Sequence, residues 1–583
     1  MATQYVGREW DCSSMRSYHV LLCTGCSLFL CSCSTGNVTF DGDSPAPGDL
    51  APGDLVVGDS GPGDVSVGDA GAGGDASLGD RDGGDSPSGD FAVGDQGFGG
   101  DSVSPVRLPS SLPFDYSRPA VGVPPSPEEI THFTRTVTGL WRDLDFFRWV
   151  DAYSHGLHRD FDPLGLGFKL WWQDVRMVRA GDTVRMEHIG GSDNQMIRTS
   201  KLLVQAASGY LLIGDEVMKG LVEQYANGIV ALCLAMAWGN DDPPVETIMA
   251  RGLFTYDHEY TTDWGDNVAV SYEEVRHEVV DTHAETIPNS DNPTWGSIWV
   301  RAQRSKDDLP YLYLADAMLL RIIEETADVS LRTAAQRAHN SIVGFTRDIV
   351  DHGYKIRTRD KFGSIYVPDG DLASFTYYDL LLANAECNKK LSTALVAYGA
   401  PLENVCGDGI NVLYDTIVVN SNWFNERMIR YYHMAAVEHA LLVGQNDVAR
   451  ELLTGIASRS VAMFADNSTR DEQPEFDSYG AVFLLTAAAV GLPLTAQEAR
   501  WIQREYSEAA AFLPAQPQFH LWDEDGVDGE YSYKITTEAD GVGYVRPEDI
   551  AELLHYCYSP WRNPSGVSFV DCDVVADPSR WGL

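Results

Sequence analysis

The chain has 583 residues, of which 85 are Asp or Glu and 42 are Lys or Arg, so its net charge at pH 7 is −43. Nucleic acids and anionic membrane surfaces attract proteins with a basic face, and a chain this acidic argues against both as partners. No nucleotide, flavin or haem motif occurs along the chain, so we expect no organic cofactor.

Residues 1–33 have the pattern of an export signal. Arg16 precedes an apolar run from Val20 to Leu30, which ends in the tetrapeptide Leu-Cys-Ser-Cys at residues 30–33. A charge, a short apolar run and a small residue before cysteine are typical of a signal peptide, and this run is too short to span a bilayer. The tetrapeptide resembles the bacterial lipobox, which implies cleavage before Cys33 and acylation of its sulfur.

The alternative is an ordinary short signal peptide or a wrongly placed start. Met15 fits the start better than Met1, because residues 1–14 carry charges that a signal peptide lacks. An acylated Cys33 would anchor the chain to a membrane that it never crosses. Ser34 follows the cysteine, which implies the outer membrane or cell surface of a bacterial envelope.

A Gly-Asp repeat with a period of five fills much of residues 34–115. Residues 34–104 hold fourteen Asp and a single Arg, and are rich in Gly, Ser and Pro. Such a segment buries too little apolar surface to offset its ordering entropy, so it predicts a disordered, extended linker. The alternative is calcium binding by a β-roll, but the period is wrong and each unit offers one carboxylate.

The cysteines beyond the signal predict two disulfides. Cys387 with Cys406 and Cys557 with Cys572 are close in sequence, and an exported compartment permits disulfides. Cys233 lies in an apolar run and is predicted to be a buried thiol.

Helical periodicity dominates residues 116–583. A helix is predicted at 127–152 and another at 547–557. Between them we predict antiparallel helix pairs, which are 195–210 with 214–238, 307–325 with 328–352, 376–398 with 409–419, 423–443 with 446–465, and 476–490 with 495–512. A small β-meander is predicted at 169–189 and a hairpin at 354–367.

The connections differ in length. Turns within pairs are short, whereas those between pairs are mostly long, so the long loops should gather at one end and form a binding face. This pattern resembles the (α/α) toroid superfamily, which includes many polysaccharide lyases and glycoside hydrolases. The resemblance implies a mainly α (α/α) toroid or barrel with small β-hairpin insertions, and a substrate groove lined by its inner helices.

Several inner helices begin with polar residues. Asp307 and Asp308 open one helix, and two adjacent carboxylates repel, which raises one pKa towards that of a general acid. Tyr377 and Asp379 open another. The competing interpretation is helix capping, because Ser305 with Asp308 has the spacing of a capping box.

The insertion at 240–303 combines aromatic residues with carboxylates and a histidine, which suits a sugar-binding cleft. The alternative is a loop that uses its aromatic residues to pack on the helices. The predicted substrate-binding residues here are Tyr256, Asp257, Trp264, Trp295 and Trp299, with His258 as a catalytic candidate; Trp171 and Trp172 of the meander join them.

His433 lies within an otherwise apolar helix. By analogy with toroid lyases, Tyr377, Asn425 and His433 could supply the acid, the neutralising group and the base. A satisfied core histidine is the default for such a position. No metal site is predicted, because residues 273–283 suit a solvated helix face and residues 538–549 lack a ligand that an EF-hand needs.

We therefore predict a carbohydrate-active enzyme, either a lyase or a hydrolase, on an extracellular polysaccharide. The catalytic candidates are Asp307, Asp308, Asp379, His258, His433 and Tyr377. The rival hypothesis is a non-catalytic surface lipoprotein that binds glycan or peptide.

Overall fold

The computed structural model of the chain describes residues 118, 122–144, 154–155, 162, 164–171, 174–180, 183–190, 195–242, 245–254, 268–270, 286–368, 375, 380–401, 423–467, 478–512, 520–522, 530–534 and 552–580. The chain divides into two units, Met1–Asp90 and Phe91–Leu583, and every described residue belongs to the second. The predicted signal with Cys33 and the 34–115 linker lie outside the described residues.

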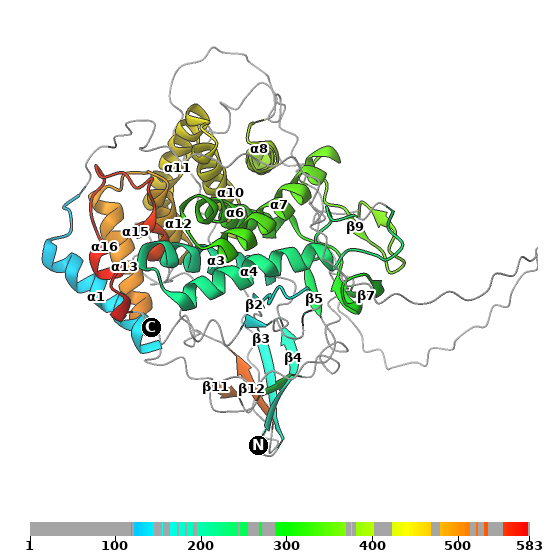
Figure 1. Cartoon of the computed structure of the whole chain (residues 1–583). Coiled ribbons are helices and arrows are strands. Elements are labelled where there is room, and N and C mark those ends of the chain that lie inside the picture. The colour runs from blue at the N-terminus through cyan, green and yellow to red at the C-terminus, as the bar shows by residue number, and fades with distance from the viewer. Residues whose placement is uncertain are drawn as a thin grey trace, which may run out of the picture. The chain divides into compact units, whose positions relative to one another are not determined.

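The described part is mainly helical, as predicted (Figure 1). Its longer helices are α1 (Pro127–Leu144), α3 (Gln195–Ile213), α4 (Glu216–Leu234), α6 (Leu309–Glu325), α7 (Val329–Asp351), α8 (Leu380–Tyr398), α10 (Trp423–Leu442), α11 (Asn446–Asn467), α12 (Ser478–Ala489) and α13 (Ala496–Phe512). Two short helices follow, α15 (Glu552–Tyr558) and α16 (Cys572–Val575). The helix predicted at 409–419 lies outside the described residues.

Four of the predicted pairs form, namely α3/α4, α6/α7, α10/α11 and α12/α13. Local chemistry explains their turns. Asp215 and Asp328 cap α4 and α7 by accepting backbone N–H groups of the first turn. Gly214 and Gly444 adopt φ angles of 81° and 76°, which the tight turns require and which a side chain would disfavour.

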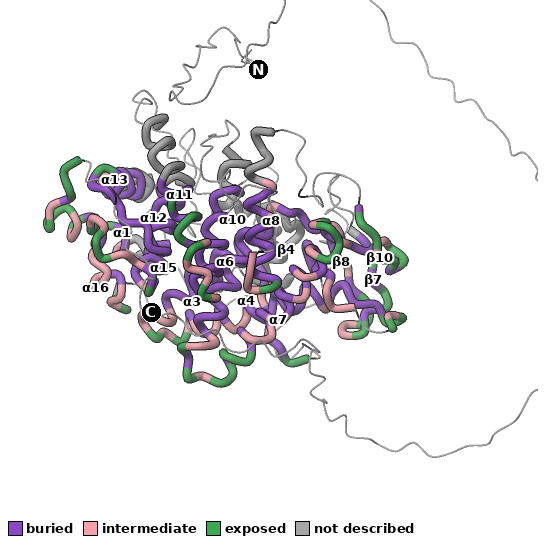
Figure 2. Tube along the Cα trace, turned by 90° about the horizontal axis from the view of Figure 1, so that it is seen from above, coloured by how far each residue is buried: buried purple, intermediate pink, exposed green. Residues whose placement is uncertain are grey.

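The helices that precede these turns form a closed cycle of contacts, α3 with α6, α6 with α10, α10 with α12, α12 with α15, and α15 with α3. In the view from above, the burial colouring marks most residues of α6 and those described in α10 as buried (Figure 2). Helix α8 contacts α6, α7 and α10.

Helices α3, α6 and α10 of this cycle run in the same direction. On α3 and α6, Lys201 lies beside Tyr311 and Ser208 beside Met318, so the partners advance together. On α6 and α10, Tyr311 stacks on Tyr431 and Arg321 pairs with Glu438.

Short turns follow the C-terminal ends of α3, α6, α10 and α12, and the long connections lead into N-terminal ends. Because α3, α6 and α10 are parallel, the short turns that follow these three helices lie at the same end.

The strands form small sheets. Strands β3 (Asp174–Ala180) and β4 (Thr183–Gly190) make the predicted antiparallel hairpin, and β9 (Thr358–Arg359) pairs with β10 (Ile365–Tyr366) as expected. Strand β1 (Ser154–His155) pairs with β2 (Leu170–Trp171).

The sheet that contains the predicted meander at 169–189 is larger than the meander itself. Its strands belong to a five-stranded sheet with the order β11-β12-β3-β4-β6, in which β11 (His520–Trp522), β12 (Glu530–Lys534) and β6 (Val268–Val270) come from distant segments. Strand β6 runs parallel to β4. Within 240–303, β5 (Gly252–Phe254), β7 (Thr286–Asn292) and β8 (Gly296–Arg301) form a third sheet.

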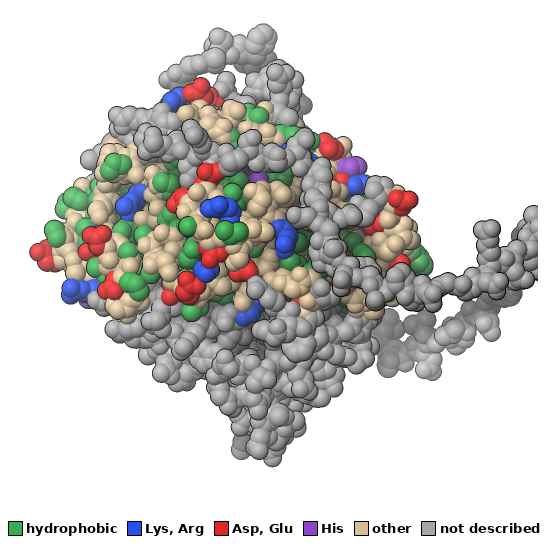
Figure 3. All heavy atoms as spheres, viewed as in Figure 1, with side chains coloured by type: hydrophobic (Ala, Val, Ile, Leu, Met, Phe, Trp, Pro, Cys, Tyr) green, Lys and Arg blue, Asp and Glu red, His purple; other side chains and the backbone are tan. Residues whose placement is uncertain are grey.

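The described surface carries side chains of both charges. On the face shown in Figure 3, acidic and basic side chains are interspersed among apolar and uncharged atoms. Among the described helices, none combines the length and the apolar character that crossing a membrane requires.

Candidate functional site

A lysine lies between two tyrosines where α3, α6 and α10 meet. The Lys201 Nζ is 5.6 Å from the ring centroid of Tyr311 and 5.5 Å from that of Tyr431. The two rings are themselves 4.4 Å apart. Cation–π attraction stabilises an ammonium in this position, and a desolvated pair is worth about 2 kcal/mol. All three side chains are buried, so the positive charge of Lys201 lies inside the layer of helices.

A second lysine lies on the other side of α6, on α8. The Lys389 Nζ is 5.8 Å from the ring centroid of Tyr432, and the Tyr432 hydroxyl donates to the Lys306 carbonyl oxygen at 2.5 Å. Burial lowers the pKa of the Lys389 ammonium to about 7, although the nearby Asp307 carboxylate opposes this shift. A lowered pKa favours the neutral amine, and a neutral amine can accept a proton.

Both lysine–tyrosine clusters lie in the N-terminal halves of α3, α6 and α8 and around the middle of α10. Arg430 of α10 adds a further cation, with its guanidinium 5.0 Å from the Phe483 ring on α12. Buried cations and aromatic faces therefore gather on this part of the helix layer, in a chain whose net charge is strongly negative.

A buried ionic network lies further along the same helices. The Arg321 Nη2 is 2.5 Å from the Glu438 carboxylate, whose other oxygen is 3.2 Å from the His555 Nε2. Burial alone would raise the pKa of Glu438, but Arg321 and His555 outweigh it and hold that pKa below its usual value. Burial lowers the pKa of His555, and Glu438 opposes that shift.

Asp316 joins a second part of this network. Its carboxylate is 2.8 Å from the His339 Nδ1 and 3.6 Å from the His439 Nε2. His439 is also 2.9 Å from the Tyr313 carbonyl oxygen. Burial lowers the pKa of His439, with Asp316 opposing. These groups connect α6, α7 and α10 through buried polar contacts, so we assign them to structure.

The adjacent carboxylates Asp307 and Asp308 do not form the predicted acid pair. The Asp308 carboxylate is fully buried and lies 3.3 Å from Nη1 of Arg304, a buried guanidinium. The Ser305 hydroxyl accepts from the Asp307 amide and so caps the short 3-10 helix Lys306–Asp308 that leads into α6, whereas Asp308, at the N-cap of α6 itself, makes no side-chain capping bond. The capping hypothesis therefore accounts for Ser305, while Asp308 neutralises a buried arginine. Asp307 is half-buried and faces the Lys389 charge.

His433 is fully buried on α10, next to Tyr432. This burial matches the default interpretation of a core histidine. Asn425 lies in the first turn of α10, where the structure describes only the backbone. Tyr377 and Asp379 precede α8 directly in the chain and lie outside the described residues.

Of the aromatic candidates, Trp295 packs against the core, with its ring centroid 5.9 Å from that of Phe168. This contact supports the loop-packing alternative for that residue. Trp299 is half-buried on β8 and pairs in register with Pro288 and Phe254. The backbone of Trp171 lies in β2. The remaining candidates lie outside the described residues, namely Trp172, Tyr256, Asp257, His258 and Trp264.

Within the described residues, no group of three or more His, Cys, Asp or Glu side chains is arranged to hold a metal ion. The segments considered for calcium, 34–115, 273–283 and 538–549, lie outside those residues.

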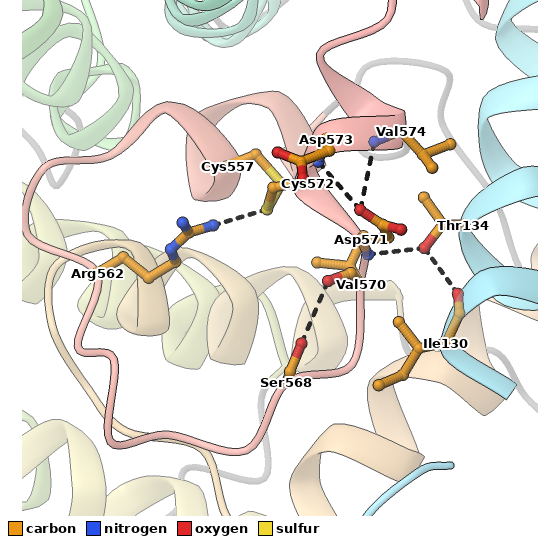
Figure 4. Close-up of a disulfide and its surroundings, with 10 residues drawn as sticks. All are labelled: Ile130, Thr134, Cys557, Arg562, Ser568, Val570, Asp571, Cys572, Asp573 and Val574. Carbon is orange, nitrogen blue, oxygen red and sulfur yellow. Dashed lines mark hydrogen bonds between the residues drawn. A yellow bond between two sulfur atoms is a disulfide. The ribbon is translucent and has the colours of Figure 1, made fainter. Parts of the chain in front are cut away.

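The Cys557–Cys572 disulfide forms, joining α15 to α16 (Figure 4). Cys387 is also disulfide-bonded, and its predicted partner Cys406 lies outside the described residues. Cys233 is a buried thiol, as expected, and burial raises its pKa to about 12.

A pocket of about 440 Å³ lies beside the Cys557–Cys572 bond, between the start of α1 and the segment 562–573. Its lining includes Pro127, Tyr556, Arg562 and Cys572. No feature of the sequence had pointed to it.

Lys201, Tyr311 and Lys389 were not predicted as site residues. Each lies in an ordinary helical stretch, where a lysine is normally exposed. The available signal in the sequence was a lysine on the apolar face of a predicted helix. Such a lysine points to a site only once the packing of the helices shows which aromatic side chains surround it.

Comparison of the chain with family models, with curated proteins and with solved structures found no match.

Proposed function

We propose that residues 116–583 form an (α/α) toroid and that a lipid on Cys33 and the 34–115 linker hold it outside a bacterial cell. The cycle of contacts among α3, α6, α10, α12 and α15 supports the toroid, as does the common direction of α3, α6 and α10. The anchor and the cell-surface location rest on the lipobox alone.

We propose further that this domain is a carbohydrate-active enzyme that acts on an acidic extracellular polysaccharide. The observation that carries the proposal is the pair of lysine–tyrosine clusters around Lys201 and Lys389. An ammonium pairs with the carboxylate of an acidic sugar, and a tyrosine face packs on a sugar ring. Because both clusters are buried, the side chains that cover them must move aside when the sugar binds. A buried lysine costs free energy, and perturbed groups of this kind concentrate at functional sites.

The chemistry of these groups favours a lyase over a hydrolase. In β-elimination from a uronate, a base removes the proton at C5, the C4–O bond breaks, and an acid protonates the leaving oxygen. Lys389 is a suitable base because its lowered pKa favours the neutral amine, and tyrosine hydroxyls are suitable acids. A hydrolase would instead need two available carboxylates, and Asp308 is occupied by Arg304.

A non-catalytic glycan-binding protein is the second candidate. It is favoured by the structural roles of Asp308 and Trp295, which remove two residues from the predicted catalytic and binding set. In that case the lysine–tyrosine clusters would hold an acidic glycan without cleaving it.

The test is to incubate the full-length chain with acidic and neutral polysaccharides. Ultraviolet absorbance of unsaturated uronates and the release of reducing ends are measured in parallel, and binding is measured by glycan array. Both signals together indicate a lyase, reducing ends alone a hydrolase, and binding alone the second candidate.

The matched variants are Lys389→Met and Lys390→Met. Lys390 neighbours Lys389 but is only half-buried and forms an ion pair with Glu386. Loss of activity or binding in Lys389→Met, with Lys390→Met unchanged, supports the assignment. Equal behaviour of the two folded variants would refute it.

A further inference from the structure

The two sulfurs of the Cys557–Cys572 disulfide differ in exposure. Cys557 is 6% exposed and lies on α15, within the cycle of packed helices. Cys572 is half-buried, begins α16 and lines the pocket of about 440 Å³. A small molecule in that pocket can reach the Cys572 sulfur, whereas packed side chains cover Cys557. A volume of this size accommodates a small organic molecule.

A guanidinium is directed at the accessible sulfur. In Figure 4, Arg562 points toward Cys572, and its Nη1 lies 2.6 Å from the Cys572 Sγ. The guanidinium also lies 5.3 Å from the ring centroid of Tyr556, a nearly buried side chain, which helps to hold it in place. A cation beside a cysteine lowers the pKa of the thiol and favours the thiolate, which is the reactive form.

Two nearby carboxylates, Asp571 and Asp573, would instead raise the pKa of the Cys572 thiol. Asp571 precedes Cys572, and its carboxylate accepts from the backbone amides of Asp573 and Val574. Asp573 is exposed, so water screens its charge. The pocket residues contributed by α1 are Pro127, Ile130 and Thr131, which carry no charge. Arg562 is therefore the charged group in direct contact with the sulfur.

We propose that Cys572 is a thiol–disulfide exchange site, with the pocket as the binding place for a low-molecular-weight disulfide and Cys557 as the resolving cysteine. In the reduced protein, the Cys572 thiolate attacks one sulfur of the small disulfide and releases one small thiolate. Cys557 then gives up its proton to that thiolate and attacks the Cys572 sulfur. The second small thiolate leaves, and the protein disulfide is restored. The protein dithiol is oxidised and the small disulfide is reduced to two thiols.

The experiment equilibrates the full-length chain in mixtures of reduced and oxidised glutathione at fixed pH. Acid quenching and alkylation follow, and mass spectrometry quantifies the peptides that contain Cys557 and Cys572. Because one pKa unit is a factor of ten, Arg562→Gln should lower the ratio of reduced to oxidised protein about tenfold at a given glutathione ratio when the fixed pH lies above the thiol pKa in both proteins, where the reduced form is a thiolate. It should also shift the pH dependence of Cys572 alkylation by iodoacetamide to higher pH.

Two further variants make the result specific. Arg450→Gln, at an exposed ion pair on α11, is the matched control and should leave both measurements unchanged. Arg562→Lys keeps the charge and should recover most of the effect, and it replaces Arg562→Gln if that variant does not fold. The proposal is overturned if folded Arg562→Gln stays within twofold of the wild type. It is also overturned if glutathione fails to reduce the bond at any ratio, which would identify a purely structural disulfide.

Discussion

Replacing Glu438 by Gln should strongly destabilise the protein. The Glu438 carboxylate is fully buried between Arg321, at 2.5 Å, and His555, at 3.2 Å. The substitution keeps the shape of the side chain but removes the carboxylate that pairs with the fully buried Arg321 guanidinium. Breaking a buried ion pair by removing one partner costs about 3 to 5 kcal/mol, and we expect a loss of that size.

The double variant Arg321→Met with Glu438→Leu tests the cause of that loss. It removes both charges, and replacing a buried pair by apolar residues is often close to neutral. Arg321 also stacks on Tyr558 and Trp561, at 5.4 and 5.5 Å, so some packing is lost with it. The double variant should therefore be more stable than Glu438→Gln alone.

The assay is urea denaturation of each variant, followed by circular dichroism and by tryptophan fluorescence. Agreement of the two probes is needed before a free energy of unfolding is assigned, because a chain of this size need not unfold in one step. The reasoning fails if Glu438→Gln lies within about 1 kcal/mol of the wild type, well short of the loss expected for an unpaired buried charge. It also fails if the double variant is the less stable of the two.

Three other outcomes are expected. The pKa values of His439 and His555 are lowered on folding, so the unfolded chain binds more protons below pH 6.5; stability should fall as the pH drops from there, by up to about 1.4 kcal/mol per pH unit for each histidine. A urea midpoint that does not change between neutral and mildly acidic pH would contradict this. Cys572→Ser opens a loop of 15 residues and should cost about 3 kcal/mol, checked by denaturation under non-reducing conditions. Asp308→Asn strands a buried guanidinium and should cost about 3 kcal/mol, whereas half-buried Asp307→Asn should cost less than about 1 kcal/mol; equal losses in thermal melts would argue against the ion pair.

The helices and most of their pairs could be predicted from the sequence because their signals are local. Apolar residues recur at helical spacing, and Asp215 and Asp328 stand where each following helix needs a cap. The short turns at Gly214 and Gly444 also set which helices are antiparallel neighbours. None of these signals requires knowledge of residues far away in the chain.

The arrangement of side chains from separate helices was decided by tertiary packing. Asp308 was open to two interpretations until Arg304 was found beside it, and whether His433 is buried was decided only by the packing of α10 against its neighbours. The strands that complete the sheet around β3 and β4 come from segments more than 80 residues away. Periodicity specifies which face of an element is buried, but it carries no information about the partner of that face.

The lysine–tyrosine clusters show the same limit. Lys201, Tyr311, Lys389 and Tyr432 come from four helices, and each is unremarkable in its own segment. Their meeting depends on the common direction of α3, α6, α8 and α10, which the sequence indicates only through loop lengths. The sequence by itself determined the helices, their caps and their short turns, because these depend on neighbouring residues. Which charges and rings meet was left to the tertiary structure, because burial and contact arise only when distant segments pack together.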